Sequence, residues 1–234
     1  LVPFNADAVA DQYLGYADAL RPHVTDTSRL LLEAFAAGKH VLVEKPVGVN
    51  AADVAEIIVD VSRLSTGEGC WGFFHEMGHN HQVSDWTFEG TGEVTCNIFA
   101  LHGLEMLCRV KEGGHGAMEK DAIAKRIDAY FKKPASLERW TDDPFTALIV
   151  YDQVRHAFGW APFRKVFGEY RTLPAGERPR SDDQKRDQWM VRFSRTVGRN
   201  LGPFFEAWGV PTSPEARASI ADLPEWMPEG FPPK

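Results

Sequence analysis

The pattern of apolar and polar residues predicts a chain that is mainly α-helical from residue 71 onward. Apolar residues recur every three or four positions in several stretches, and this spacing is typical of helices that bury one face. The stretches that show it are 71–81, 91–110, 119–131, 144–158, 161–171 and 182–198, and a shorter one follows Ser213. Glycine- and proline-containing turns separate these stretches. We therefore expect a helical bundle that occupies most of the chain.

Start signals support the limits of two of these helices. Asp142 or Asp143 stands just before Pro144, and proline is favoured in the first turn of a helix behind a capping side chain. Asp182 and Asp183 place negative charge where the positive end of a helix dipole favours it. Helices are therefore predicted to begin at these two points.

A different pattern occupies the start of the chain. A helix is predicted over residues 29–36, a short buried strand over 40–44, and a second helix over 51–64. This order of elements indicates a small α/β segment over residues 1–66. The helical part then forms a domain over residues 67–234, and the fold class is mainly α with a small α/β N-terminal part.

Composition and charge exclude several classes of protein. The net charge of −7 argues against a general nucleic-acid-binding surface. No apolar run approaches the roughly 18 residues that a membrane-spanning helix needs. Three cysteines are too few, and odd in number, for a disulfide framework. We interpret Cys70, Cys96 and Cys108 as core thiols, with the last two on one predicted helix.

Residues 75–79 read His-Glu-Met-Gly-His, which is the HExxH pattern. In a helix, positions i and i+4 lie on the same face, so His75 and His79 can bind one metal ion. Glu76 then stands beside the metal, where it can deprotonate a metal-activated water. Gly78 costs the helix about 1 kcal/mol relative to alanine, and such local conflicts are found at functional sites. The pattern therefore predicts a zinc hydrolase.

A catalytic zinc site needs a third protein ligand and an open fourth position for water. The candidates downstream are Glu89, Glu93, His102 and Glu105. Glu93 is favoured, because it follows a glycine-bounded turn and begins a helix that can return antiparallel to the first. Glu89 lies in the turn and ranks second, while Glu105 lies about three turns further along and is too remote. Asn97 shares the face of Glu93 and can contact the site.

Three segments of this region resemble a known family. The enhancin-like, mucin-degrading gluzincin zinc metallopeptidases are closely resembled by the segments WGFFHEMGHNHQ, DWTF and GTGEVTCN. The resemblance continues toward the C-terminus through DPFTALIVYDQV, FGWAPFRKVFGEYR and LPEWMP. It implies Zn²⁺ bound by His75, His79 and Glu93, with Glu76 as general base and acid. It also implies gluzincin-type catalytic helices packed on a helical C-terminal bundle. Protein or glycoprotein substrates and a secreted or cell-surface location follow from the same resemblance.

A second resemblance lies near the start of the chain. Residues 22–62 include AGKHVLVEKP and resemble a fragment of the Gfo/Idh/MocA-type sugar oxidoreductases. In that family the lysine of the EKP motif, here Lys45, lies near nicotinamide and substrate. A dinucleotide site also needs a glycine-rich turn between a strand and a helix, and the residues before Lys45 contain none. We therefore predict no nucleotide site and rank an NAD-dependent oxidoreductase last among the candidate functions.

Taken together, these patterns predict a zinc-dependent endopeptidase that acts on glycoprotein or mucin-like substrates. Glu76 is the expected general base on a metal-activated water. In the metallopeptidase family, a segment before the first metal helix forms the upper wall of the cleft, and here the EKP-like stretch stands in its place. The alternative is therefore a metallopeptidase-like zinc-binding module with an incomplete cleft and impaired catalysis.

Overall fold

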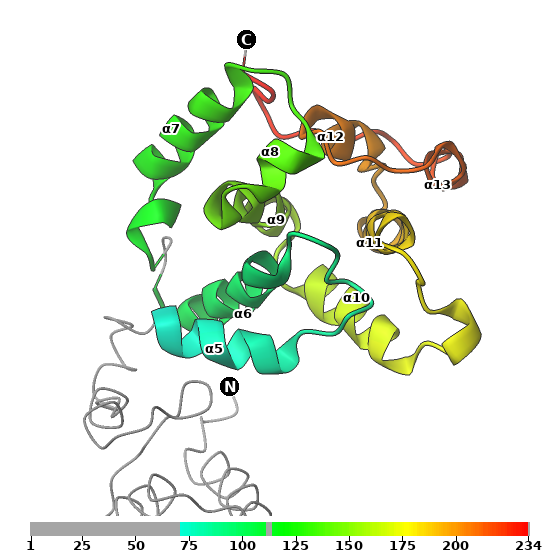
Figure 1. Ribbon diagram of the computed structural model, residues 1–234, viewed down its shortest axis with the longest axis horizontal. Helices are drawn as coiled ribbons and strands as arrows, with labels where there is room; N and C mark the ends of the chain where they lie inside the picture. The colour runs from blue at the N-terminus through cyan, green and yellow to red at the C-terminus, as the bar shows by residue number, and fades with distance from the viewer. Residues whose placement is uncertain (1–70, 111–113, 234) are drawn as a thin grey trace, which may run out of the picture. The chain divides into compact units, whose positions relative to one another are not determined.

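The computed structural model describes residues 71–110 and 114–233, and this part of the chain is mainly α-helical (Figure 1). The fold class predicted for the helical part is confirmed. The α/β segment predicted over residues 1–66, with its EKP-like stretch, lies outside the described residues. Within the described ranges, extended pairing is limited to one parallel bridge between Asn200 and Glu225. No helix among the described residues is long and apolar enough to cross a membrane.

The α-helices of the described residues follow one another along the chain. They are α5 (Trp71–His81), α6 (Gly92–Met106), α7 (Lys120–Phe131), α8 (Leu137–Thr141), α9 (Pro144–Phe158), α10 (Ala161–Thr172), α11 (Asp182–Val197), α12 (Gly202–Ala207) and α13 (Pro214–Ser219). Two short 3-10 helices lie in the connections, η2 (Gly116–Met118) and η3 (Ala175–Glu177).

Most of the predicted helix limits agree with the structure. α5 and α9 begin and end at the predicted residues, and α7, α10 and α11 differ by one residue at one end. Of the two aspartates before Pro144, the cap is Asp143, whose carboxylate accepts a hydrogen bond from the backbone N–H of Phe145. Ser213 caps α13 in the same way, as its position predicted. These limits are decided by local signals, which the sequence carries.

Two short helices, α8 and α12, were not predicted. α8 is only five residues long, so it is too short to show a helical period in its apolar residues. Its start signal is nevertheless present, because the side chain of Ser136 accepts a hydrogen bond from the backbone N–H of Arg139. The capping serine was therefore the signal in the sequence for the start of this helix.

The helix predicted over residues 91–110 is too long, because α6 ends at Met106. At Arg109 the backbone φ is 59°, in the left-handed region that an α-helix cannot contain. Cys108 therefore lies beyond the helix that carries Cys96. Both thiol side chains are buried, as predicted.

α9 is the centre of the described fold. In Figure 1 it lies among α6, α7, α8 and α10, and it contacts all four. Its buried side chains point in several directions and include Ala147, Leu148, Ile149, Val150, Tyr151 and Val154. Burying one large aliphatic side chain stabilises a fold by about 1.5–3 kcal/mol. The central helix therefore provides a firm support for α6, which carries Glu93.

α5 and α6 pack closely against each other through glycine. A Cβ atom at Gly78 would lie 2.3 Å from the backbone carbonyl oxygen of Cys96, which is far inside van der Waals contact. Further along the same contact, a Cβ at Gly103 would lie 2.5 Å from the ring of Phe74. The glycine inside the HExxH pattern therefore sets the distance between the two helices.

The loop between α5 and α6 is held by residues at and before the start of α11. Asp85 is buried, and its carboxylate accepts a hydrogen bond from Arg178 at 3.2 Å. The ammonium group of Lys185 donates to the carbonyl of Thr87 at 3.1 Å. Trp86 lies between Asp85 and Thr87 in the sequence, and its side chain is fully buried in the core. These contacts restrain the segment that connects the two predicted metal helices.

A polar network joins α6 to α9 near the C-terminal end of α6. The guanidinium of Arg155 donates to Asp152 at 2.9 Å and to Glu105 at 2.5 Å, and the indole N–H of Trp160 donates to the same Glu105 oxygen at 3.0 Å. His156 lies 3.4 Å from the other oxygen of Asp152. Burial opposes ionisation of Asp152, yet His156 and Arg155 hold the pKa of its carboxyl below the ordinary value. We call these five residues the Asp152 network.

We predict that Gly78→Ala lowers the free energy of unfolding by up to about 2 kcal/mol. The overpacking cost of about 1–3 kcal/mol exceeds the gain of about 1 kcal/mol from removing a helical glycine. Urea denaturation of the metal-free protein measures the difference. Gly168→Ala in α10 is the matched control, because its Cβ enters open space and should stabilise the protein by about 0.5–1 kcal/mol. Equal stability of the two variants would contradict the packing argument.

We predict that Asp152→Asn lowers the free energy of unfolding by about 3 kcal/mol at neutral pH, because it disrupts a buried charged network. The folded-state pKa of Asp152 lies below its ordinary value. The stabilisation is therefore complete above about pH 4 and is lost as the pH falls through the folded-state pKa. Urea denaturation at neutral and acidic pH should show the difference from wild type shrinking in acid.

The matched control for this measurement is Asp128→Asn, because Asp128 is exposed on α7. Substitution of an exposed side chain should change stability by less than about 0.5 kcal/mol. A difference between Asp152→Asn and wild type that stays constant from neutral to acidic pH would refute the assignment.

Candidate metal centre

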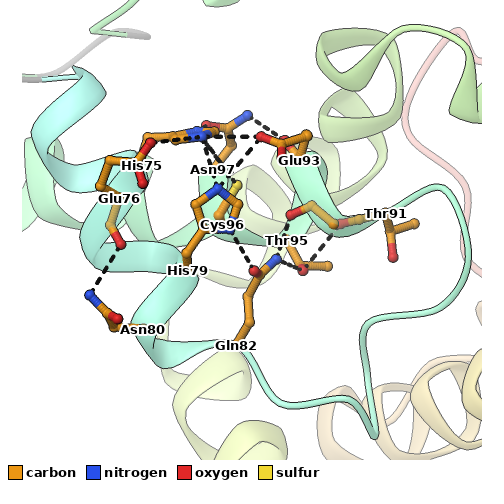
Figure 2. Close-up of polar contacts among 11 residues, drawn as sticks. His75, Glu76, His79, Asn80, Gln82, Thr91, Glu93, Thr95, Cys96 and Asn97 are labelled. Carbon is orange, nitrogen blue, oxygen red and sulfur yellow. Dashed lines mark hydrogen bonds and ion pairs between the residues drawn. The ribbon is translucent and has the colours of Figure 1, made fainter. Parts of the chain in front are cut away.

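The structure brings together the three metal ligands that the sequence predicted. His75 and His79 lie one turn apart on α5, and Glu93 lies in the first turn of α6 (Figure 2). The Nε2 atoms of the two imidazoles are 3.1 Å apart. Oε2 of Glu93 lies 3.2 Å from Nε2 of His75 and 3.5 Å from Nε2 of His79. Two nitrogen atoms and one oxygen atom thus form a compact triangle.

The size of this triangle fits a zinc ion. Ligand atoms about 2.0–2.1 Å from a tetrahedral zinc ion are roughly 3.3 Å from one another. The observed separations of 3.1, 3.2 and 3.5 Å lie close to that value. Imidazole nitrogen and carboxylate oxygen are also the donor types of catalytic zinc sites. The donor set therefore fits the metal that the sequence predicted.

His75 is oriented by Asn97, which the sequence placed near the site. The amide nitrogen of Asn97 donates to the backbone carbonyl of Glu93 at 2.7 Å. This contact turns the amide oxygen toward Nδ1 of His75, 2.7 Å away. An amide oxygen only accepts hydrogen bonds, so Nδ1 carries the proton and Nε2 presents a lone pair. The imidazole therefore offers Nε2 to the other ligand atoms.

Glu76 lies beside the triangle and outside it. Its Oε1 atom is 4.0 Å from Nε2 of His75, which is longer than any separation between the predicted ligand atoms. The side chain is 19% exposed, so it is not fully buried. A carboxylate beside the ligand atoms has the placement that a general base needs.

Cys96 lies beside the ligands, and its sequence position had predicted only a core thiol. Its sulfur is 3.5 Å from Nδ1 of His75 and 4.0 Å from Nε2, so it is nearer the edge of the ring that faces Asn97. Burial, and then the negative charge of Glu93, raise the pKa of this thiol to about 12. We assign Cys96 to the buried floor of the site. Its position three residues after Glu93, on the same helix face, was the available signal.

The other candidates for the third ligand lie away from the triangle. Glu89 is exposed in the turn, and Glu105 accepts hydrogen bonds within the Asp152 network. The ring of His102 packs edge-on against Trp160, with the centroids 4.9 Å apart. In the described part of the chain, the one group of histidine, cysteine and acidic side chains close enough to share an ion consists of His75, His79, Glu93 and Cys96.

Curated relatives match a large part of this chain. TRPM8 channel-associated factor 3 from Mus musculus is 41% identical over 161 residues. The matched region covers 68% of this chain and 17% of the mouse protein. The chain therefore spans less than a fifth of the length of this relative.

Solved structures share the fold. A conserved protein from Bacillus anthracis str. Ames, described as functionally unknown, is 26% identical, with a TM-score of 0.61 over 75% of this chain and 35% of that chain. The IMPa metallopeptidase from Pseudomonas aeruginosa is 20% identical, with a TM-score of 0.52 over 67% of this chain and 23% of that chain. The likeness to IMPa concerns the fold alone.

A family match covers both predicted metal helices. Residues 36–209 match the family described as Peptidase M60, enhancin and enhancin-like. The match includes α5 through α12, together with part of the segment that resembles oxidoreductases. This confirms the resemblance to the enhancin-like metallopeptidases, and the chain belongs to the Peptidase M60, enhancin and enhancin-like family.

Proposed function

We propose that this chain carries the catalytic centre of a zinc-dependent endopeptidase. The observation that carries the proposal is the triangle of ligand atoms from His75, His79 and Glu93, with the carboxylate of Glu76 beside it. Its dimensions fit zinc. Membership of the M60 family supports a metallopeptidase-like function for the chain as a whole.

The proposed roles follow from the chemistry of each side chain. Zinc, when bound, would supply a Lewis acid that makes a water molecule more acidic and polarises the scissile carbonyl. Glu76 accepts a proton from the attacking water at a carboxylate oxygen and passes it to the nitrogen of the leaving amine. His75, His79 and Glu93 hold the centre with a single negative charge among them, so a divalent ion leaves net positive charge for the developing oxyanion.

We propose glycoprotein or mucin-like proteins as the substrates. The support is the resemblance of the segments around His75 and Glu93 to mucin-degrading members of the family. A peptide bond is the reacting group in either case, so the roles proposed for Glu76 and the metal ligands do not depend on the glycan.

A zinc-binding module without peptidase turnover is the second candidate. The curated relative at 41% identity is named for its association with a channel and not for proteolysis. In this case the same triangle would hold zinc, and the ion would join α5 to α6. The two candidates agree on metal binding and differ in the role of Glu76.

We predict that the wild-type chain binds one equivalent of zinc and that Glu93→Ala weakens binding by more than about 100-fold. The loss should exceed the 10–100-fold effect of removing a residue that only supports a ligand. Metal analysis after dialysis and competition with a chelator measure the affinity. Glu89→Ala is the matched control, because this exposed glutamate lies four positions away and outside the triangle. Weaker binding in Glu89→Ala than in Glu93→Ala would show that the wrong glutamate was assigned.

We predict that Glu76→Gln lowers kcat for casein or mucin cleavage by about 100- to 10,000-fold while zinc stays bound, because the amide cannot accept the proton. Glu177→Gln, an exposed substitution at η3, is the matched control and should leave kcat unchanged. Equal kcat in wild type and Glu76→Gln would rule out the general-base role. A zinc-loaded wild type that cleaves neither protein would favour the second candidate.

A further inference from the structure

We propose that Gln82 is a positioning residue of the metal centre. A single amide group orients His79 and ties the start of α6, which carries Glu93, to the end of α5. The inference rests on the proposed zinc site and assigns to it a supporting residue that the HExxH pattern does not include.

Gln82 contacts both metal helices at once. It directly follows α5, and its backbone N–H donates to the carbonyl of Gly78 at 3.0 Å. Its side-chain nitrogen donates to the carbonyl of Gly92 at 2.6 Å and to the hydroxyl of Thr95 at 2.5 Å, both in the first turn of α6. Its amide oxygen lies 2.9 Å from Nδ1 of His79. Figure 2 shows the side chain of Gln82 between His79 and Thr95, with dashed lines to both.

The direction of this amide is decided by its partners on α6. A backbone carbonyl only accepts hydrogen bonds, so the amide nitrogen must face Gly92. The hydroxyl of Thr95 donates its own hydrogen to the carbonyl of Thr91 at 3.3 Å, which leaves its oxygen free to accept from Gln82. Rotating the amide would bring two oxygen atoms within 2.6 Å of each other. The amide oxygen therefore faces His79.

The consequence for His79 is a defined tautomer. Because the amide oxygen accepts, the proton of the neutral imidazole lies on Nδ1. Nε2 then directs a lone pair toward His75 and Glu93, as metal binding requires. Each imidazole of the site thus has its own amide partner: Asn97 for His75 and Gln82 for His79.

The consequence for Glu93 is a restrained backbone. Its side chain is 59% exposed, so side-chain packing does little to hold the carboxylate in place. The first turn of α6 also begins without a side-chain cap, because Thr91 makes no capping hydrogen bond. Gln82 binds the residue immediately before Glu93 and the hydroxyl two residues after it. The amide group of Gln82 therefore restrains the backbone around Glu93 and also orients His79.

The first test measures the tautomer of His79 in the metal-free protein. Long-range proton–nitrogen spectra at about pH 8.5, where an ordinary imidazole is neutral, distinguish Nδ1–H from Nε2–H. Wild type should show His79 protonated on Nδ1, and Gln82→Met should lose this preference while His75 keeps it. A proton on Nε2 of His79 in wild type, or the same tautomer in both proteins, would overturn the proposal.

The second test measures zinc affinity by competition with a chelator. Gln82→Met should weaken binding by about 10- to 100-fold, as loss of a supporting residue does. Gln82→Glu keeps an acceptor for Nδ1 but has no N–H for α6, so its affinity should lie between those of Gln82→Met and wild type. Gln184→Met on α11 is the matched control and should bind zinc as wild type does. Unfolding of the metal-free variants verifies that each one is folded.

The outcomes separate this inference from the proposed function. If wild type binds zinc and Gln82→Met binds it within about twofold of wild type, well below the effect of losing a supporting residue, the inference fails and the zinc site stands. If wild type binds no zinc, the proposed function fails and the positioning role fails with it. If Gln82→Met does not fold, Gln82→Glu decides the question: an affinity equal to that of wild type would refute the link to α6.

Discussion

The close approach of α5 to α6 is the constraint on which the candidate metal centre depends. At Gly78 the backbone of Cys96 occupies the space where a side chain would otherwise stand. Only at this separation do the imidazoles on α5 lie 3.2 and 3.5 Å from the carboxylate on α6. Metal–ligand distances tolerate deviations of about 0.2 Å, so a shift large enough to admit one methyl group would exceed that tolerance. The glycine is unfavourable for the helix and necessary for the site.

The centre gathers hydrogen-bond acceptors that would not meet without the fold. With their Nδ1 protons directed at the amide oxygens of Asn97 and Gln82, the two Nε2 atoms face each other and Glu93 with no hydrogen between them. A bound cation would relieve the repulsion among the two Nε2 lone pairs and the carboxylate of Glu93. Outside the site, the core around α9 and the Asp152 network stabilise the fold that positions these groups. Local conflict that is offset elsewhere is typical of functional sites.

Local signals allowed much of the fold to be predicted. Apolar periodicity and caps such as Asp143 are properties of neighbouring residues, so the limits of α5 and α9 followed from them. α8 was not predicted, because its five residues show no helical period. The helix predicted for α6 was too long, because apolar residues continue past its end at Met106. In both cases the apolar pattern alone was a poor guide to where the helix lies.

The sequence by itself determined which side chains face one another along a single helix. The spacing of His75 and His79, and the glycine-bounded turn before Glu93, indicated the ligand set because both are local features of the chain. Helix geometry also placed Asn97 near the site, but the tertiary structure alone decided that Gln82 and Cys96 contact the ligands. The amide of Gln82 spans two helices, and Cys96 reaches the site from beneath, so both contacts exist only after α5 and α6 have packed. Helical periodicity describes one helix at a time, and the supporting contacts of this centre arise between two.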